Sequence, residues 1–263
     1  MPEGDTIHRT AANLRKALDG AVILQCTGRD AEFAQNTLAN SSVVGIEARG
    51  KHLMIHLDDD RVLHSHMGMT GSWHIYRPDD EWHKPSNQAV VALHTERWCV
   101  VCFTPKLIQL LSARQLQRDA WLQKLGPDIL GPPIDDRVVL NRFRTQNSVA
   151  IGEVLMNQTV LSGIGNIYKS EILFMEQLHP LRRVDTLSDG QILLLRDRAL
   201  SLMKRNLQKP ARQTRFRSDA PRLWVYGRSG QPCLLCGRNI EMLRQGTLAR
   251  STCFCPACQP ADQ

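Results

Sequence analysis

The stretch LMNQTVLSGIGNIYKSE, residues 155–171, decides how the second half of the chain folds. It joins an apolar helical segment to a new helix through the turn Gly163-Ile-Gly165-Asn166. The turn is not a dinucleotide-binding fingerprint, because it follows a helix and lacks a third glycine. It presents backbone N–H groups and a helix start, which suit a phosphate, although a plain interhelical turn is the alternative.

Upstream of this stretch the sequence is typical of antiparallel β structure. Eight short segments between residues 21 and 111 are rich in β-branched residues and are separated by turn signals such as DDD and RPDDE. They predict an antiparallel sandwich or barrel. A helix over residues 5–18 precedes them, with Asp5 as the expected N-cap and Gly20 as the stop. Its apolar face consists of Ile7, Ala11, Leu14 and Leu18.

Downstream the pattern becomes helical and then rich in cysteine. The segment at residues 126–136, GPDILGPPIDD, is rich in proline and glycine and predicts a linker. Ser188 and Gln191 form a capping-box pair at the start of a long helix. A small metal-type module is expected from about residue 226. The expected parts are therefore 1–125, the linker 126–136, 137–225 and 226–263.

The charge of the chain is unevenly distributed. Of 263 residues, 42% are hydrophobic, which allows a proper core, and the net charge is +7. Residues 1–140 hold 15 Lys/Arg against 17 Asp/Glu, and residues 141–263 hold 18 against 9. The basic half predicts a polyanion partner, with a solvated basic surface as the alternative. With no apolar run long enough for a membrane span and no signal-peptide pattern, we expect a cytoplasmic protein.

Two C-x-x-C pairs near the end of the chain predict a tetrahedral zinc site. Cys233 with Cys236, and Cys255 with Cys258, are separated by 18 residues. Cys253 is left out because it belongs to neither pair. So short a segment has little core, and zinc would supply its folding energy. Redox chemistry is the alternative.

Other cysteine and histidine pairs favour structural roles. Cys99 and Cys102 lie in an expected strand, where residues three apart point to opposite faces, so we expect buried thiols there and at Cys26. His64 and His66 share a strand face. With no third ligand expected nearby, we interpret them as packing or hydrogen-bonding residues.

Six motifs together resemble the formamidopyrimidine-DNA glycosylase/endonuclease VIII family of base-excision repair enzymes. They are MPEG, ARGKHL, SHMGMTGSW, LMNQTVLSGIGNIYKSE, RLWVYGRSGQPC and ARSTCFCPACQ, in the order of the family. The resemblance implies an α+β multidomain fold: an N-terminal helix with an antiparallel β-sandwich, a helix–two-turn–helix domain and a C-terminal zinc finger. It also implies one structural Zn²⁺ and damaged double-stranded DNA as the partner of a monomer, which would associate with the nucleoid through that DNA.

The resemblance also implies which residues carry the chemistry. After removal of the initiator methionine, the Pro2 amine would attack C1′ of the deoxyribose, and Glu3 would be the general acid. An α-amine titrates at about 8 and a lysine at about 10.4, so the Pro2 amine is more readily unprotonated. As a secondary amine it would form an iminium ion, an electron sink for strand cleavage. Without the resemblance, Glu3 is a helix-start charge and Lys51 a solvated lysine.

The DNA-contacting residues follow in the same way. Lys51, Asn166 and Arg250 would contact phosphates around the flipped nucleotide, and Met69 would be the apolar wedge. Tyr168 and Lys169 are expected to line the same surface as Asn166.

The choice of branch depends on a loop that is absent from the sequence. An Arg-Arg-Phe-Gly loop, found in the oxidised-purine branch, is absent from residues 89–111, and the segment before WVYGR is short. Both features resemble endonuclease VIII and favour oxidised pyrimidines over oxidised purines.

Two other classes compete with a glycosylase. A non-catalytic DNA-damage binder or zinc-containing regulator on the same scaffold would not need a free Pro2 amine and Glu3. A pure RNA-binding ribbon protein is disfavoured because aromatic residues make up only 5% of the chain.

Overall fold

The computed structural model describes residues 2–29, 33, 35–209 and 211–261. The chain divides into two compact units, Met1–Lys124 and Leu125–Gln263. No helix in the described ranges is long and apolar enough to cross a membrane. Each unit has its own hydrophobic core.

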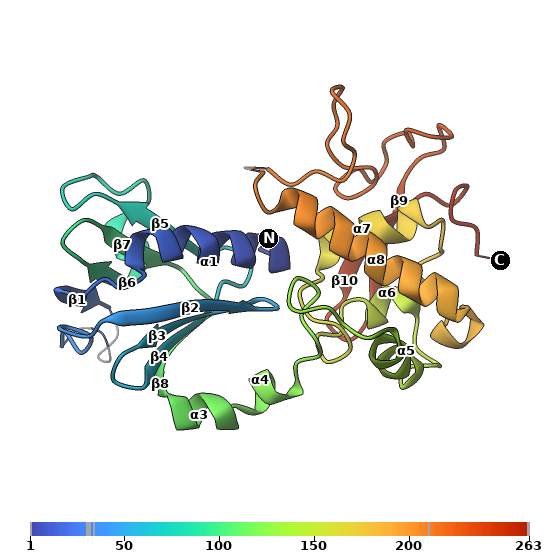
Figure 1. Cartoon of the computed structure of the whole chain (residues 1–263). Helices are drawn as coiled ribbons and strands as arrows, with labels where there is room; N and C mark the ends of the chain where they lie inside the picture. The colour runs from blue at the N-terminus through green and yellow to red at the C-terminus, as the bar shows by residue number, and fades with distance from the viewer. Residues whose placement is uncertain (1, 30–32, 34, 210, 262–263) are drawn as a thin grey trace. The chain divides into compact units, whose positions relative to one another are not determined.

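The first unit consists of a long helix and two antiparallel four-stranded sheets (Figure 1). One sheet has the order β2-β3-β4-β8 and the other the order β1-β6-β7-β5. The elements are α1 (Gly4–Leu18), β1 (Gln25–Gly28), β2 (Val43–Arg49), β3 (His52–Leu57), β4 (Arg61–His66), β5 (Ser72–Tyr76), η1 (Ser86–Gln88), β6 (Ala89–His94), β7 (Cys99–Phe103), β8 (Leu107–Ser112), α3 (Ala113–Arg118) and α4 (Ala120–Lys124).

Helix α1 packs on the core of the first unit through the predicted apolar face. Ile7, Ala11, Leu14 and Leu18 are at most 1% exposed, which confirms that face. The predicted start is wrong, because α1 begins at Gly4 with Glu3 as its N-cap, and Asp5 lies within the first turn.

The thiols of β7 point to opposite faces of their sheet, as predicted. Cys102 belongs to the large core that also contains Leu53 and Ile55 of β3. Cys99 packs in a second, smaller cluster with Tyr76. Burial raises the pKa of both thiols, so they are inert core groups.

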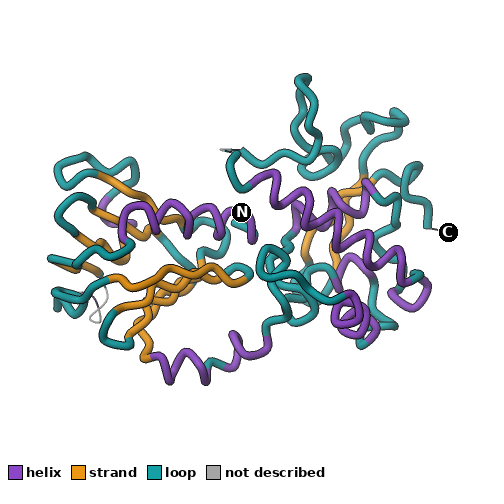
Figure 2. Tube along the Cα trace, viewed as in Figure 1, coloured by secondary structure: helices purple, strands orange, loops and turns teal. Residues whose placement is uncertain are grey.

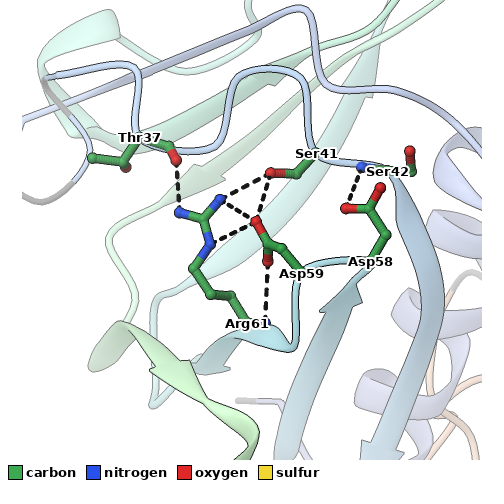
Figure 3. A network of polar contacts seen from close by, with 6 residues as sticks. All are labelled: Thr37, Ser41, Ser42, Asp58, Asp59 and Arg61. Carbon is green, nitrogen blue, oxygen red and sulfur yellow. Dashed lines mark hydrogen bonds and ion pairs between the residues drawn. The ribbon is translucent and has the colours of Figure 1, made fainter.

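Arg61 ties the β3–β4 turn to the segment before β2 (Figure 3). Its guanidinium donates to the Thr37 carbonyl (2.7 Å), to Ser41 Oγ (2.9 Å) and to Asp59 Oδ2 (Nε, 2.9 Å). The Ser41 hydroxyl donates to the same Asp59 oxygen at 3.2 Å. Arg61 therefore joins two loops on one side of the first unit.

The second unit is mainly helical and ends in a two-stranded hairpin (Figure 2). In its long helix α8 the predicted capping box is confirmed, since Gln191 N–H donates to Ser188 Oγ (3.2 Å) and Ser188 N–H to Gln191 Oε1 (2.9 Å). The elements are α5 (Asp136–Arg144), α6 (Ile151–Val154), α7 (Asn166–Met175), η2 (Val184–Thr186), α8 (Asp189–Asn206), β9 (Glu241–Gln245) and β10 (Arg250–Phe254).

Helix α7 is the centre of the second unit. It begins at Asn166, directly after the turn in which Gly163 has a φ of +108°, a conformation that side chains rarely adopt. All of its residues from Tyr168 to Phe174 are buried. It packs against α8 and against β10 of the hairpin. The predicted glycine-rich turn therefore positions a helix that is enclosed on most sides.

Candidate active site and zinc centre

Four cysteine sulphurs near the end of the chain meet at one point. The Sγ atoms of Cys233, Cys236, Cys255 and Cys258 lie within 4.8 Å of one another. Two of the separations are 3.9 Å (Cys233–Cys258) and 3.5 Å (Cys236–Cys255). A tetrahedral zinc with Zn–S bonds of ~2.3 Å places its sulphurs ~3.8 Å apart, so the four thiolates fit one structural Zn²⁺.

Cys253 lies outside this sulphur cluster, as predicted. It is 5% exposed and packs with Phe174, Val225 and Ile240. Its backbone N–H donates to Ser170 Oγ at 3.2 Å. Cys253 therefore helps to join β10 to α7.

Pro2 and Glu3 are held at the start of α1. The Glu3 carbonyl accepts hydrogen bonds from Thr6 N–H (2.9 Å) and Ile7 N–H (3.1 Å), and the residue is 0% exposed. Pro2 is half-buried. The positive end of the helix dipole therefore lies beside Pro2.

Lys51 and Met69 lie in two turns of the first unit. Lys51 is half-buried between β2 and β3, after Gly50 with a φ of +60°. Met69 follows β4 and is 66% exposed, so its side chain is available as an apolar surface group.

A third histidine joins the two that the sequence singled out. His52 lies opposite His66 in the β3–β4 register, and the two rings are 4.8 Å apart. His52 Nδ1 is hydrogen-bonded to His64 Nε2 at 2.9 Å. The predicted hydrogen bonding is confirmed, and His52 is a partner that the sequence pattern did not reveal. The antiparallel pairing of these strands is the signal that identifies His52.

Burial lowers the pKa of all three imidazoles. Burial lowers the pKa of His52 to about 3, and the neighbouring His66 and His64 add to the effect. Burial, with Lys106 and Lys51 nearby, lowers the pKa of His66 to about 4.

The predicted phosphate-contacting residues of the second unit lie beside one another. Asn166 is the first residue of α7, and its Nδ2 lies 3.4 Å from Ser251 Oγ. Arg250 precedes Ser251 at the start of β10 and is half-buried. Asn166 is 4% exposed, so a ligand reaches only a small part of its side chain.

The expectation that Tyr168 and Lys169 line a surface is wrong. Both are 0% exposed, because α7 is enclosed by its neighbours. Tyr168 belongs to the core, and the Arg212 guanidinium lies 5.0 Å from its ring centroid. Lys169 Nζ donates to Asn166 Oδ1 (3.2 Å) and to the Ser251 carbonyl (3.1 Å).

Glu171 is a buried anchoring residue that the sequence did not reveal. Its buried carboxylate accepts hydrogen bonds from the backbone N–H groups of Trp224 (2.8 Å), Val225 (2.9 Å) and Tyr226 (2.8 Å). The Thr214 hydroxyl also donates to it. Burial raises the pKa of Glu171, and these hydrogen bonds oppose that shift. Glu171 anchors the segment 214–226, which carries part of the basic stretch, to α7.

Three family models match successive parts of the chain. They are the formamidopyrimidine-DNA glycosylase N-terminal domain at residues 1–106, the formamidopyrimidine-DNA glycosylase H2TH domain at 125–218, and the zinc finger found in FPG and IleRS at 230–261.

Named relatives agree over the full length. A probable endonuclease 8 2 of Streptomyces coelicolor is 35% identical over 98% of this chain and 94% of its own length. A DNA-(apurinic or apyrimidinic site) lyase Nei2 of Mycolicibacterium smegmatis is 33% identical over 100% of both chains. A mutant FPG of Lactococcus lactis, crystallised with DNA containing Fapy-dG, superposes with a TM-score of 0.83 at 25% identity, covering 98% of this chain and 100% of its own. The chain therefore belongs to the formamidopyrimidine-DNA glycosylase/endonuclease VIII family and is a DNA glycosylase and abasic-site lyase of base-excision repair.

Proposed function

We propose that the enzyme removes oxidised pyrimidines from duplex DNA and then cuts the strand through a covalent intermediate on Pro2. The observation that carries the proposal is the start of α1, where Glu3 is buried and its main chain is fixed by two hydrogen bonds. An acid and an adjacent amine held on one helix end suit a reaction at a single carbon atom.

The chemistry uses both residues. The ring oxygen takes a proton from the Glu3 carboxyl as the C1′–O4′ bond opens, and the base leaves from this ring-opened sugar. The Pro2 nitrogen forms a bond to C1′ and gives up its proton to the departing base, which takes the electrons of the broken C1′–base bond, so that an iminium ion is left on C1′. Loss of a C2′ proton then expels the 3′ phosphate and cleaves the strand.

Duplex binding is assigned to side chains of each unit. We infer that Lys51 contacts backbone phosphate near the lesion and that Asn166 and Arg250 contact the phosphates that flank it. Met69 is exposed and fills the gap that the flipped base leaves. The enzyme acts as a monomer.

The preference for pyrimidines rests on short connections in the first unit. Strands β6 and β7 are joined by a tight turn in which Thr95 N–H donates to the Trp98 carbonyl at 2.8 Å. Only residues 104–106 join β7 to β8. These turns hold no Arg-Arg-Phe-Gly loop, which is a feature of the oxidised-purine branch.

Duplexes that each carry one defined lesion test the substrate class. Under single-turnover conditions, thymine glycol and dihydrouracil are expected to be excised faster than 8-oxoguanine opposite cytosine. If 8-oxoguanine is the fastest substrate, the pyrimidine assignment is wrong.

A second experiment distinguishes the role of Pro2 from that of Glu3. Glu3→Gln is expected to slow base excision by roughly 10²-fold or more, in the range of a general acid, while borohydride trapping on abasic DNA largely survives. Asp19→Asn, an exposed acid just after the same helix, is the matched control. Equal loss of both activities in Glu3→Gln, or normal trapping by protein that retains Met1, would refute the assigned roles.

A further inference from the structure

We propose that Lys169 is a positioning residue that fixes the α7 turn to the zinc-finger hairpin, so that Asn166 and Arg250 grip phosphate as one unit. The inference deepens the proposed function and rests on the phosphate contacts assigned there. The observation behind it is a lysine with 0% exposure whose ammonium group bridges two segments 82 residues apart in sequence.

The burial of this ammonium group needs a reason. Lysine is almost never fully buried, because removing its charge from water costs several kcal/mol unless hydrogen bonds replace the water. Here Nζ donates to Asn166 Oδ1 at 3.2 Å and to the Ser251 carbonyl at 3.1 Å. A methionine would fill the same space without that cost. These two hydrogen bonds are therefore what a lysine provides at this position and a methionine does not.

The first of these hydrogen bonds sets the orientation of the Asn166 amide. An ammonium group has donors only, so the oxygen of the amide must face Lys169 and the Nδ2 group must face away. Nδ2 lies 3.4 Å from Ser251 Oγ, a long contact that a phosphate oxygen readily replaces. A flipped amide would instead present its oxygen to the phosphate and repel it. Lys169 thereby keeps a donor turned toward the ligand.

The second hydrogen bond holds the strand that carries Arg250. Ser251 follows Arg250 directly in β10, and Arg250 pairs with Gln245 of β9 at the turn end of the hairpin. Anchoring the Ser251 carbonyl fixes the backbone of Arg250 relative to the α7 turn. The buried Lys169 ammonium group thus couples the two side chains that bind phosphate. It also places a positive charge next to the Asn166 amide, on the side away from the phosphate.

Salt-dependent binding to duplex DNA that carries a tetrahydrofuran abasic analogue tests the coupling. Arg250→Ala is expected to reduce the slope of log K against log salt by ~0.9, the value for one phosphate contact. Lys169→Met is expected to reduce the slope by a similar amount and to weaken binding by about tenfold, with one zinc per chain retained. Lys124→Met, which removes a lysine from α4 of the first unit, is the matched control and leaves the slope unchanged.

A double-mutant cycle separates positioning from general destabilisation. In the Arg250→Ala background, Lys169→Met is expected to weaken binding by less than about twofold, because the contact it positions is already lost. An additive tenfold loss, or an unchanged slope in Lys169→Met alone, overturns the inference. If Arg250→Ala itself leaves the slope unchanged, the phosphate grip of the proposed function fails instead.

Asn166→Asp tests the amide orientation without removing Lys169. The inward oxygen keeps its hydrogen bond to Lys169 and becomes part of a carboxylate, so the variant is expected to be as thermally stable as the wild type. Its outward oxygen then faces the phosphate, and binding is expected to be about tenfold weaker than that of Asn166→Ala. Binding equal to or tighter than that of Asn166→Ala overturns the inference, whether or not Lys169→Met folds.

Discussion

Replacing the Glu171 carboxylate by a carboxamide is expected to loosen the segment 214–226. In Glu171→Gln, one of the two acceptor oxygens becomes an NH₂ group that faces N–H donors. Either it faces Val225 and Tyr226, or it faces Trp224 and the Thr214 hydroxyl. The second orientation is less unfavourable, because a hydroxyl can turn to accept a hydrogen bond whereas a backbone N–H cannot.

The cost of that orientation follows from the groups involved. One buried N–H, that of Trp224, loses its acceptor at a cost of ~1–3 kcal/mol, and the remaining hydrogen bonds lose the strengthening effect of the charge, ~1 kcal/mol each. Glutamine avoids the desolvation cost that raises the Glu171 pKa, which offsets part of the loss. A net change of ~2–3 kcal/mol in the local opening free energy corresponds to a factor of about 30–150.

Hydrogen–deuterium exchange of the backbone amides at Val225 and Tyr226 measures this change directly. Their protection factors are expected to fall by about 30- to 150-fold in Glu171→Gln, the fold-change that corresponds to ~2–3 kcal/mol. The control is Glu241→Gln, an exposed acid of β9 in the same unit. Protection that stays within about threefold of the wild type would refute the anchoring role.

Two further predictions concern the metal and pH. Chelation of zinc, or Cys258→Ser, is expected to abolish binding to abasic duplex DNA. Cys253→Ser is expected to keep one zinc per chain and to lose ~1–3 kcal/mol of folding stability. Metal analysis and thermal unfolding check both results, and loss of zinc in Cys253→Ser with zinc retained in Cys258→Ser would contradict the ligand assignment. The pKa values of His52 (about 3) and His66 (about 4) in the folded protein lie below the value of ~6.5 in the unfolded chain. At a pH between the folded and the unfolded pKa of each histidine, the unfolded chain therefore binds more protons than the folded protein. Their stabilising contribution is therefore complete above about pH 6.5 and is lost as the pH falls through about 4 for His66 and about 3 for His52. The free energy of unfolding in urea measures this loss. A free energy that stays constant between about pH 6.5 and 4.5, or a pH dependence that His66→Gln leaves unchanged, contradicts the prediction.

Features that depend on a local residue pattern could be predicted from the sequence. The buried face of α1 follows from helical spacing, the cap of α8 from the pair Ser188 and Gln191, and the zinc cluster from two C-x-x-C spacings. The opposite orientations of Cys99 and Cys102 follow from the alternation of a strand.

Features that depend on residues distant in the sequence could not be predicted. Lys169 belongs to a helix whose own sequence mixes polar and apolar residues, and its burial depends on Ser251, 82 residues later. Glu171 likewise depends on the backbone at residues 224–226. His52 becomes a neighbour of His66 only through the register of β3 and β4. In each case a tertiary contact outweighs the local tendency of a charged or polar side chain to face water.

The long-range contacts of α7 also impose an order on biosynthesis. Lys169 and Glu171 leave the ribosome well before the distant backbone groups that they bind in the folded protein, the last of which belongs to Ser251. At a synthesis rate of ~5–20 residues per second, Lys169 waits roughly 4–16 s for Ser251, 82 residues later, and Glu171 waits roughly 3–11 s for Tyr226, 55 residues later. The first unit, whose residues end at Lys124, is complete before α7 is made. The second unit acquires its buried charges in final form only when the zinc-finger hairpin has emerged, so completion of the helical core waits for synthesis of that hairpin.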